Sequence, residues 1–159
     1  MLPRQLLEPL LPFALILGLS GATFGQAGAL HERLAKAASL SCTFSALAVG
    51  TWTNGTAGAE TTRATLLVKY VAINVDEGTA DAEGQFVGAS SVVVRYVNGY
   101  LHLMQTHRAG PLYTTTVLAK ETKGGRLMAV HTRHEYSDVR LPGFTSSPEM
   151  YLGDCAPGT

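Results

Sequence analysis

The sequence predicts an all-β fold, either a single antiparallel up-and-down β-barrel or a β-sandwich. The chain has 159 residues, of which 46% are hydrophobic and 15% are charged, and this composition suffices for one packed core. Its β-branched and aromatic runs alternate with a period of two, which is the spacing of strands. Glycine, asparagine or aspartate punctuates these runs at regular intervals, and little helical pattern lies between them.

Residues 1–29 have the composition of a secretory signal peptide. Arg4 lies near the start, an apolar stretch runs from Leu10 to Leu19, and Ala27-Gly28-Ala29 forms a small-residue cleavage motif. We expect cleavage after Ala29, with Ala27 and Ala22 as the alternative positions. The mature protein is then exported, to the periplasm or the extracellular space, with no stable membrane span.

An uncleaved membrane anchor is the alternative interpretation of this leader. No charged residue lies between Glu8 and His31, and about 20 apolar residues are enough to cross a bilayer. The glycines, Ser20, Thr23 and Gln26 make the second half only weakly apolar, and this composition favours cleavage.

The segment 30–41 is expected to be a short helix or an irregular lead-in. Leu30, Leu34 and Ala37 or Ala38 share one face if the segment is helical. The barrel domain follows as residues 42–159, without a repeat or a linker that would divide it. Its expected strands lie in the runs ATLLVKYVAINV, SSVVVRYV, YLHLMQT, LYTTTVLAKET and RLMAVHTRHEYS.

Cys42 and Cys155 lie near the two ends of the mature chain. In an oxidising compartment such a pair becomes a disulfide, and a bond that closes so long a loop stabilises a fold by about 2 to 4 kcal/mol. Two free thiols are the alternative in a reducing location. A catalytic thiol is disfavoured, because neither cysteine lies in a C-x-x-C motif or beside a basic residue.

Asn98-Gly99 is predicted to form a type I′ hairpin turn, because both of its central positions need a positive φ. The resulting register pairs Val97 with Tyr100, Arg95 with His102, and Val93 with Met104. One face of the hairpin is uniformly apolar and is the predicted core face: Val92, Val94, Tyr96, Leu101 and Leu103. Arg95 and His102 share the other face, either as a polar pair facing water or at the mouth of a cavity.

A second hairpin is expected to turn at Gly124-Gly125. Its register would pair Lys123 with Arg126, and would place Ala119 near Val130 and Leu118 near His131. The following segment, HTRHEYSD, is the densest polar cluster, and in a strand His131 and Arg133 share a face, as do His134 and Tyr136. His131 and His134 would point to opposite faces, so no metal site is expected here.

Other motifs do not support a specific chemistry. The acidic run NVDEGTADAEG lacks the D-x-D-x-D-G spacing of a calcium loop, so we interpret it as a solvated turn. The chain has no phosphate-binding glycine-rich loop and no G-x-S-x-G nucleophile motif, and we expect no cofactor. Its 12 basic and 12 acidic residues balance, which gives no positive field for nucleic acid.

The motifs INVDEG, LHLMQ, TTTVLA, MAVHTRHEY and YLGDC, between Cys42 and Cys155, resemble those of small exported bacterial proteins of unassigned function. The fold that this resemblance implies is a calycin-like (lipocalin-like) β-barrel. Gly50-Thr51-Trp52 is similar to the G-x-W start of lipocalins, in which Trp52 would plug one barrel end. The resemblance implies no activity and no catalytic residue.

Three functional hypotheses follow. The first is an exported binding module for a small, mainly apolar ligand. The second is an envelope component that binds a protein partner, and the third is an enzyme in which His131 is the acid or base and Arg133 holds an anionic group. Tyr70 and Tyr113 are further lining candidates, and the main candidate ligand-binding residues are Trp52, Arg95, Tyr96, His102, His131 and Arg133.

Overall fold

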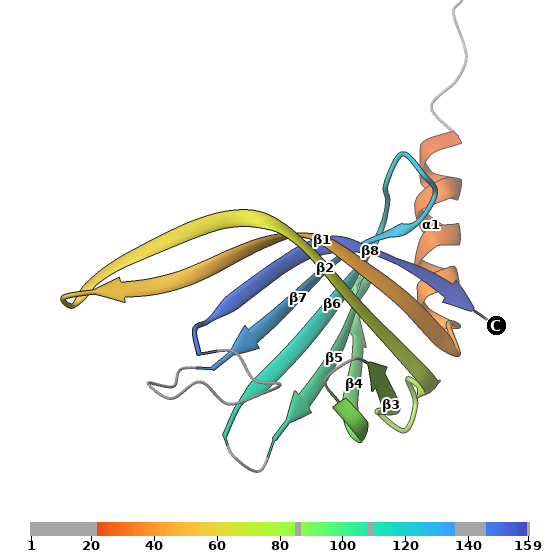
Figure 1. Cartoon of the computed structure of the whole chain (residues 1–159). Helices are drawn as coiled ribbons and strands as arrows, with labels where there is room; N and C mark the ends of the chain where they lie inside the picture. The colour runs from red at the N-terminus through yellow and green to blue at the C-terminus, as the bar shows by residue number, and fades with distance from the viewer. Residues whose placement is uncertain (1–21, 85–86, 108–109, 136–145, 159) are drawn as a thin grey trace, which may run out of the picture.

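The computed structural model describes residues 22–84, 87–107, 110–135 and 146–158 (Figure 1). Eight antiparallel strands follow one another around a single sheet, and β8 pairs with β1 to close the barrel. The barrel prediction is therefore confirmed over the sandwich. The elements are α1 (Ala22–Ala35), β1 (Ser39–Thr53), β2 (Thr56–Asn74), β3 (Thr79–Gly84), β4 (Val87–Val97), β5 (Tyr100–Thr106), β6 (Leu112–Glu121), β7 (Leu127–His134) and β8 (Glu149–Gly158).

Inward and outward side chains alternate along the strands, as the period of two predicts. In β7, for example, every second residue from Leu127 to Arg133 is buried. Apolar inward residues of the strands form the core, together with Leu34 of α1. The largest fully buried strand residues are Tyr70, Phe44, Leu40, Leu101, Leu103 and Leu127.

The Asn98-Gly99 hairpin has the predicted register. Arg95 pairs with His102 and Val93 with Met104. Asn98 and Gly99 have φ values of 49° and 80°, which both central residues of a type I′ turn require. The predicted core face is also confirmed, because its valines and leucines are buried while Tyr96 is half-buried.

The predicted register of the β6–β7 hairpin is wrong. Val130 pairs with Thr116 rather than Ala119, and His131 pairs with Thr115 rather than Leu118. Gly125 has a φ of 72°, but Gly124 does not have a positive φ, so the two glycines do not form a type I′ turn. The backbone instead closes a wider loop, in which Thr122 N donates to Arg126 O, and the ladder shifts between Val117 and Glu121.

The acidic run is only partly a turn. Residues 75–78 turn, and Asn74 Oδ1 accepts hydrogen bonds from the N–H groups of Asp76 and Glu77. The remainder, predicted as solvated turn, is strand β3, in which Ala80 and Ala82 are buried while Asp81 and Glu83 are exposed. The sequence did not predict this strand, because its inward residues are alanines and its outward residues are charged. It therefore lacks the large apolar side chains that are typical of a strand.

Helix α1 covers one end of the barrel. Its Leu34 is fully buried in the core, Tyr96 Oη donates to His31 O over 3.1 Å, and Arg33 Nη2 donates to Gly125 O in the β6–β7 turn. The predicted N-terminal helix therefore exists, but it lies at Ala22–Ala35 rather than within 30–41, and β1 already begins at Ser39.

The predicted leader falls mostly outside the described residues, which begin at residue 22. Helix α1 runs through the expected cleavage position after Ala29. In the part of the chain that the structure describes, no helix is long and apolar enough to cross a membrane.

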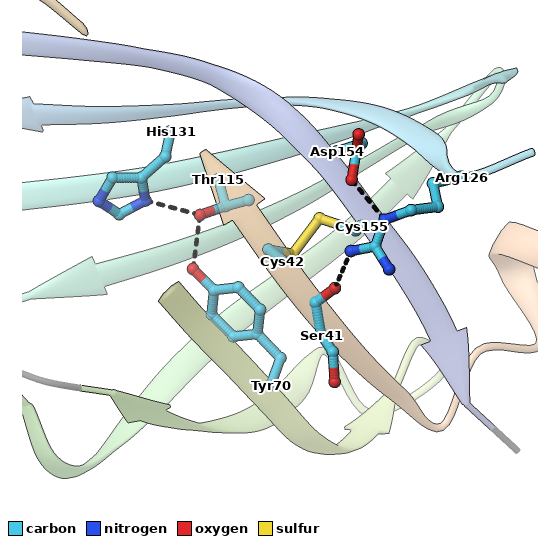
Figure 2. The surroundings of a disulfide bond; sticks show 8 residues. All are labelled: Ser41, Cys42, Tyr70, Thr115, Arg126, His131, Asp154 and Cys155. Carbon is cyan, nitrogen blue, oxygen red and sulfur yellow. Dashed lines mark hydrogen bonds and ion pairs between the residues drawn. A yellow bond between two sulfur atoms is a disulfide. The ribbon is translucent and has the colours of Figure 1, made fainter. Parts of the chain in front are cut away.

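The first and last strands meet at a covalent seam. Cys42 and Cys155 are direct partners across β1 and β8 and form the predicted disulfide. On the outer side of the same seam, Arg126 forms an ion pair with Asp154 and donates to Ser41 O over 3.0 Å (Figure 2). Strands β1 and β8 are thereby also linked to the residue that precedes β7, where the barrel closes.

The β1–β2 hairpin is longer than the barrel. Among the described residues, positions 56–67 of β2 pair only with β1, because β3 joins β2 at Val68 and beyond. Figure 1 shows the far part of this hairpin extending past the other strands. Asn54-Gly55 forms its turn with φ values of 51° and 78°.

Candidate functional site

The inward side chains become polar at the barrel end opposite α1. The β5–β6 and β7–β8 connections lie at that end, because successive strands run up and down and α1 lies against the β4–β5 and β6–β7 turns. We use the name polar cluster for five residues there, contributed by β6, β7 and β8: Tyr113, His131, Arg133, Glu149 and Tyr151.

Arg133 is the central cation of the polar cluster and is only 7% exposed. Its Cζ lies 5.2 Å from the ring centroid of Tyr113 and 5.3 Å from that of Tyr151. Its Nη1 lies 3.6 Å from Glu149 Oε2. A guanidinium removed from water needs such compensation, here from two π faces and one carboxylate.

Each tyrosine of the polar cluster donates to a carboxylate. Tyr151 Oη donates to Glu149 Oε2 over 2.6 Å, and Tyr113 Oη donates to Glu135 Oε2 over 2.9 Å. Burial, and then the hydrogen bond to Glu135, raise the pKa of Tyr113 to about 12. Burial and the bond to Glu149 raise the pKa of Tyr151 as well. Both phenols therefore stay protonated and act as donors.

A buried hydrogen-bonded chain continues from the polar cluster into the barrel. His131 Nδ1 lies 2.8 Å from Thr115 Oγ1, which lies 2.5 Å from Tyr70 Oη (Figure 2). Arg133 Nε donates to His131 Nε2 over 3.4 Å. This contact assigns the ring proton to Nδ1, so that Nδ1–H donates to Thr115.

Burial is the main cause of the protonation state of this chain. It lowers the pKa of His131 to about 3, with a further contribution from Arg133, so the ring is neutral near pH 7. Burial also raises the pKa of Tyr70 to about 12. The hydrogen-bonded chain of Tyr70, Thr115 and His131 is therefore uncharged, and it ends at the positively charged Arg133.

His107 lies beside the polar cluster, with its ring centroid 4.7 Å from that of Tyr113. Its Nε2 is buried and has no hydrogen-bond partner among the described residues. An unsatisfied polar atom in such a place is a position where a bound group or a water molecule completes the hydrogen bonding.

The structure brings together only two of the six main predicted ligand-binding residues, His131 and Arg133. Tyr96 is half-buried toward α1, at the other end of the barrel. Arg95 and His102 lie on the outer face, where His102 Nδ1 lies 3.0 Å from Thr116 Oγ1. They form a cross-strand pair at the surface, not a cavity mouth.

Trp52 does not plug the barrel. It is 52% exposed and lies on the part of β1 that extends beyond the closed sheet. Strand β1 begins at Ser39, and its pairing with β8 ends at Val49, so the strand leaves the barrel before Trp52.

Three residues of this region were not identified from the sequence: Glu149, Tyr151 and Thr115. The spacing of the first two from Cys155 could have identified them. A buried half-cystine at Cys155 points inward, so the alternation of β8 also points Tyr151 and Glu149 inward. Thr115 was missed because the β6–β7 register was predicted with Leu118 opposite His131.

A hollow of about 550 Å³ lies elsewhere, over the outer side of β1, β2 and β3. Exposed, outward-pointing residues line most of it, including Leu67, Lys69 and Glu83, and the last two form an ion pair. We place the candidate site at the polar cluster instead. Burying a charged side chain has a free-energy cost and is rare, whereas exposed charged side chains are common on any protein surface.

The polar cluster is suited to recognition more than to proton transfer. Both ring nitrogens of His131 already have partners, and its pKa of about 3 makes it a weak base near pH 7. No group of three or more His, Cys, Asp or Glu side chains in the described ranges is arranged to hold a metal ion.

The fold and this cluster together define the class of the molecule: an eight-stranded up-and-down barrel, closed by a disulfide, with a buried arginine at one end. No protein-family model, curated protein or solved structure was found to match the chain.

Proposed function

We propose that this protein is an exported β-barrel that binds a small, mainly apolar ligand, and that the polar cluster binds the ligand's polar group. The observation that carries the proposal is the burial of Arg133 between Tyr113 and Tyr151 at one end of the barrel. The cluster presents a guanidinium, which is the side chain best suited to bind carboxylate-like acceptors.

The cost of burying these groups supports a role in recognition. A buried ion pair is often no more stabilising than apolar side chains of similar volume. The α1 end of this barrel is filled in that apolar way, with Leu34, Leu40 and Leu127 fully buried. The other end instead holds the charged pair Arg133 and Glu149. We therefore attribute this pair to ligand binding and not to the stability of the fold.

The disulfide supports the exported location, because such bonds persist in oxidising compartments. The closed eight-stranded sheet agrees with the calycin-like barrel that the sequence resembles, and barrels of eight strands either fill their interior with side chains or hold one small ligand. The alternative of an enzyme is less favoured, since His131 is neutral and engaged on both ring nitrogens.

The proposal is tested with 1-anilinonaphthalene-8-sulfonate, which combines apolar rings with an anionic acceptor. We expect fluorescence enhancement with the wild-type protein and at least a fivefold weaker affinity for Arg133→Gln. Arg95→Gln is the matched control, because Arg95 is exposed on the outer face of β4. Thermal unfolding of each variant establishes that it is folded at the titration temperature.

Equal dye affinity in the two variants would contradict the assigned site, and no enhancement in any protein would contradict a ligand-binding barrel. Native mass spectrometry of protein from a secretory host adds an independent measurement. A mass that is lost on denaturation identifies a ligand that copurifies with the protein.

A further inference from the structure

His107 extends the polar end of the barrel by one residue beyond strand β5. Its N–H donates to Pro111 O over 3.0 Å, which continues the register that pairs Gln105 with Tyr113. Side chains two residues apart in an extended strand point to the same side of a sheet. Gln105 points into the barrel and is 2% exposed, so the half-buried His107 side chain also points inward, at the barrel mouth.

The imidazole of His107 carries an unpaired nitrogen. Its Nε2 is buried and has no hydrogen-bond partner among the described residues. The ring packs against Tyr113, with 4.7 Å between the two ring centroids. A buried polar atom without a partner raises the free energy of the structure that contains it. A ligand that supplies the partner recovers this cost on binding.

Tyr113 connects His107 with Arg133. Its ring packs against the His107 ring, and its centroid lies 5.2 Å from Arg133 Cζ. The unpaired nitrogen and the buried guanidinium therefore lie beside the same aromatic side chain. Two polar groups that are close together in one small ligand can reach both.

The charges at this end favour a ligand with a single anionic group. Among the described residues, Arg133 is the buried cation, and its Nη1 already lies 3.6 Å from Glu149 Oε2. Glu135 follows Arg133 by two residues and accepts the hydrogen bond of Tyr113, so this carboxylate also lies near the mouth. A second anion beside His107 would approach it, and we therefore expect a neutral group there.

A hydroxyl group satisfies His107 in either tautomer. In a neutral imidazole one nitrogen donates and the other accepts, and a hydroxyl group does both. A carbonyl oxygen would fit only the tautomer that carries its proton on Nε2.

We propose that His107 is a specificity-determining residue, and that the ligand is an apolar monocarboxylate with a hydroxyl group close to the carboxylate. The carboxylate binds Arg133, and the hydroxyl group forms a hydrogen bond with His107 Nε2. This inference rests on the binding function proposed above and adds the chemical class of the ligand.

Isothermal titration calorimetry with three acids tests the inference: decanoate, 3-hydroxydecanoate and 10-hydroxydecanoate. We expect the wild-type protein to bind 3-hydroxydecanoate at least fivefold more tightly than either of the others. The 10-hydroxy isomer has the same atoms as the 3-hydroxy acid, but its hydroxyl group is far from the carboxylate.

His107→Phe is the main variant, because phenylalanine keeps an aromatic ring beside Tyr113 but has no ring nitrogen. It should bind decanoate and 3-hydroxydecanoate with affinities that differ by less than twofold. His134→Phe is the matched control, since His134 is exposed on the outer face of β7, and it should keep the wild-type preference. Thermal unfolding establishes that each variant is folded at the titration temperature.

Equal affinities of the wild-type protein for decanoate and 3-hydroxydecanoate would overturn the inference, and this comparison does not require any variant to fold. A preference that persists in His107→Phe would assign the hydroxyl group to another residue. Equally tight binding of the 10-hydroxy isomer would contradict a hydroxyl site beside Arg133.

The two proposals fail in different ways. If the protein binds the fluorescent dye but none of the three acids, the ligand class is wrong and the binding function stands. If it binds neither the dye nor the acids, the binding function itself is contradicted.

Discussion

At the scale of single residues, His131 shows how burial changes a side chain. Its alternation with Arg133 predicts a shared face, and that prediction is confirmed. Its partner Thr115 comes from β6, and the donor Arg133 Nε on its own strand determines that the ring proton lies on Nδ1. A residue that ordinarily titrates near neutral pH is thereby a neutral donor in the folded barrel.

His131 should make the barrel sensitive to acid. Its pKa is about 3 in the folded protein and 6.5 in the unfolded chain, so below pH 6.5 the unfolded chain binds the additional proton. Stability is fully present above pH 6.5 and falls toward pH 3, by up to about 1.4 kcal/mol per pH unit from this group. Urea unfolding at pH 7, 6 and 5 measures this slope.

The variant His131→Asn retains a donor near Thr115 but does not titrate, so its stability should depend less on pH. His134→Asn is the control, since His134 is exposed on the same strand. An unchanged slope in His131→Asn would assign the acid sensitivity to other groups.

Gly153 occupies a position that has no room for a side chain. A Cβ at this position would lie 2.1 Å from Thr43 O and 2.6 Å from Phe44 Cα, where the pairing of β1 shifts. Gly153→Ala should lower the free energy of unfolding by about 2 kcal/mol or more, because backbone atoms must move. Gly124→Ala, in an uncrowded turn, should change it by less than about 0.5 kcal/mol in the same urea titration.

At the scale of elements, the two hairpins explain why one register was predictable and the other was not. Asn-Gly has one strongly preferred two-residue turn, so the local sequence determines the pairing of β4 with β5. Gly-Gly permits several backbone conformations. The wider loop and the shifted ladder of β6–β7 depend on what the flanking residues bury, which is a property of the whole barrel.

The packing of helix α1 against the barrel end can be tested through Leu34. Leu34 is fully buried at the barrel end, so Leu34→Ala should lower the free energy of unfolding by about 2 to 4 kcal/mol through the cavity it leaves. Lys36→Ala is the control, because Lys36 is exposed and pairs only across one helical turn with Glu32 in the described structure. Equal urea midpoints for the two variants would mean that the helix is not packed into the barrel end.

At the scale of the whole molecule, stability depends on closing the ring. The disulfide joins the first and last strands across 113 residues of chain, and the hydrogen-bonded ladder of β1 with β8 closes the same seam. A barrel that opened here would expose two strand edges and the core behind them.

Removing the disulfide should therefore lower the free energy of unfolding by about 2 to 4 kcal/mol. Equilibrium urea unfolding of wild-type protein with dithiothreitol, and of the double variant Cys42→Ser/Cys155→Ser, should give the same reduced midpoint. Dithiothreitol should not affect the double variant. A wild-type midpoint that is insensitive to the reductant would show that the bond is absent in solution.

Four features were predictable from the chain alone: the β class, the Asn98-Gly99 register, the shared face of His131 and Arg133, and the disulfide. Each depends on local spacing, turn chemistry or the pairing of only two cysteines. Which polar residues meet depends on the assembled barrel. Tyr113, Glu149 and Tyr151 surround Arg133 because β6, β7 and β8 lie side by side in a given register. That register, like the projection of Trp52 beyond the barrel, follows from closing the sheet around one core, and no short stretch of sequence encodes it.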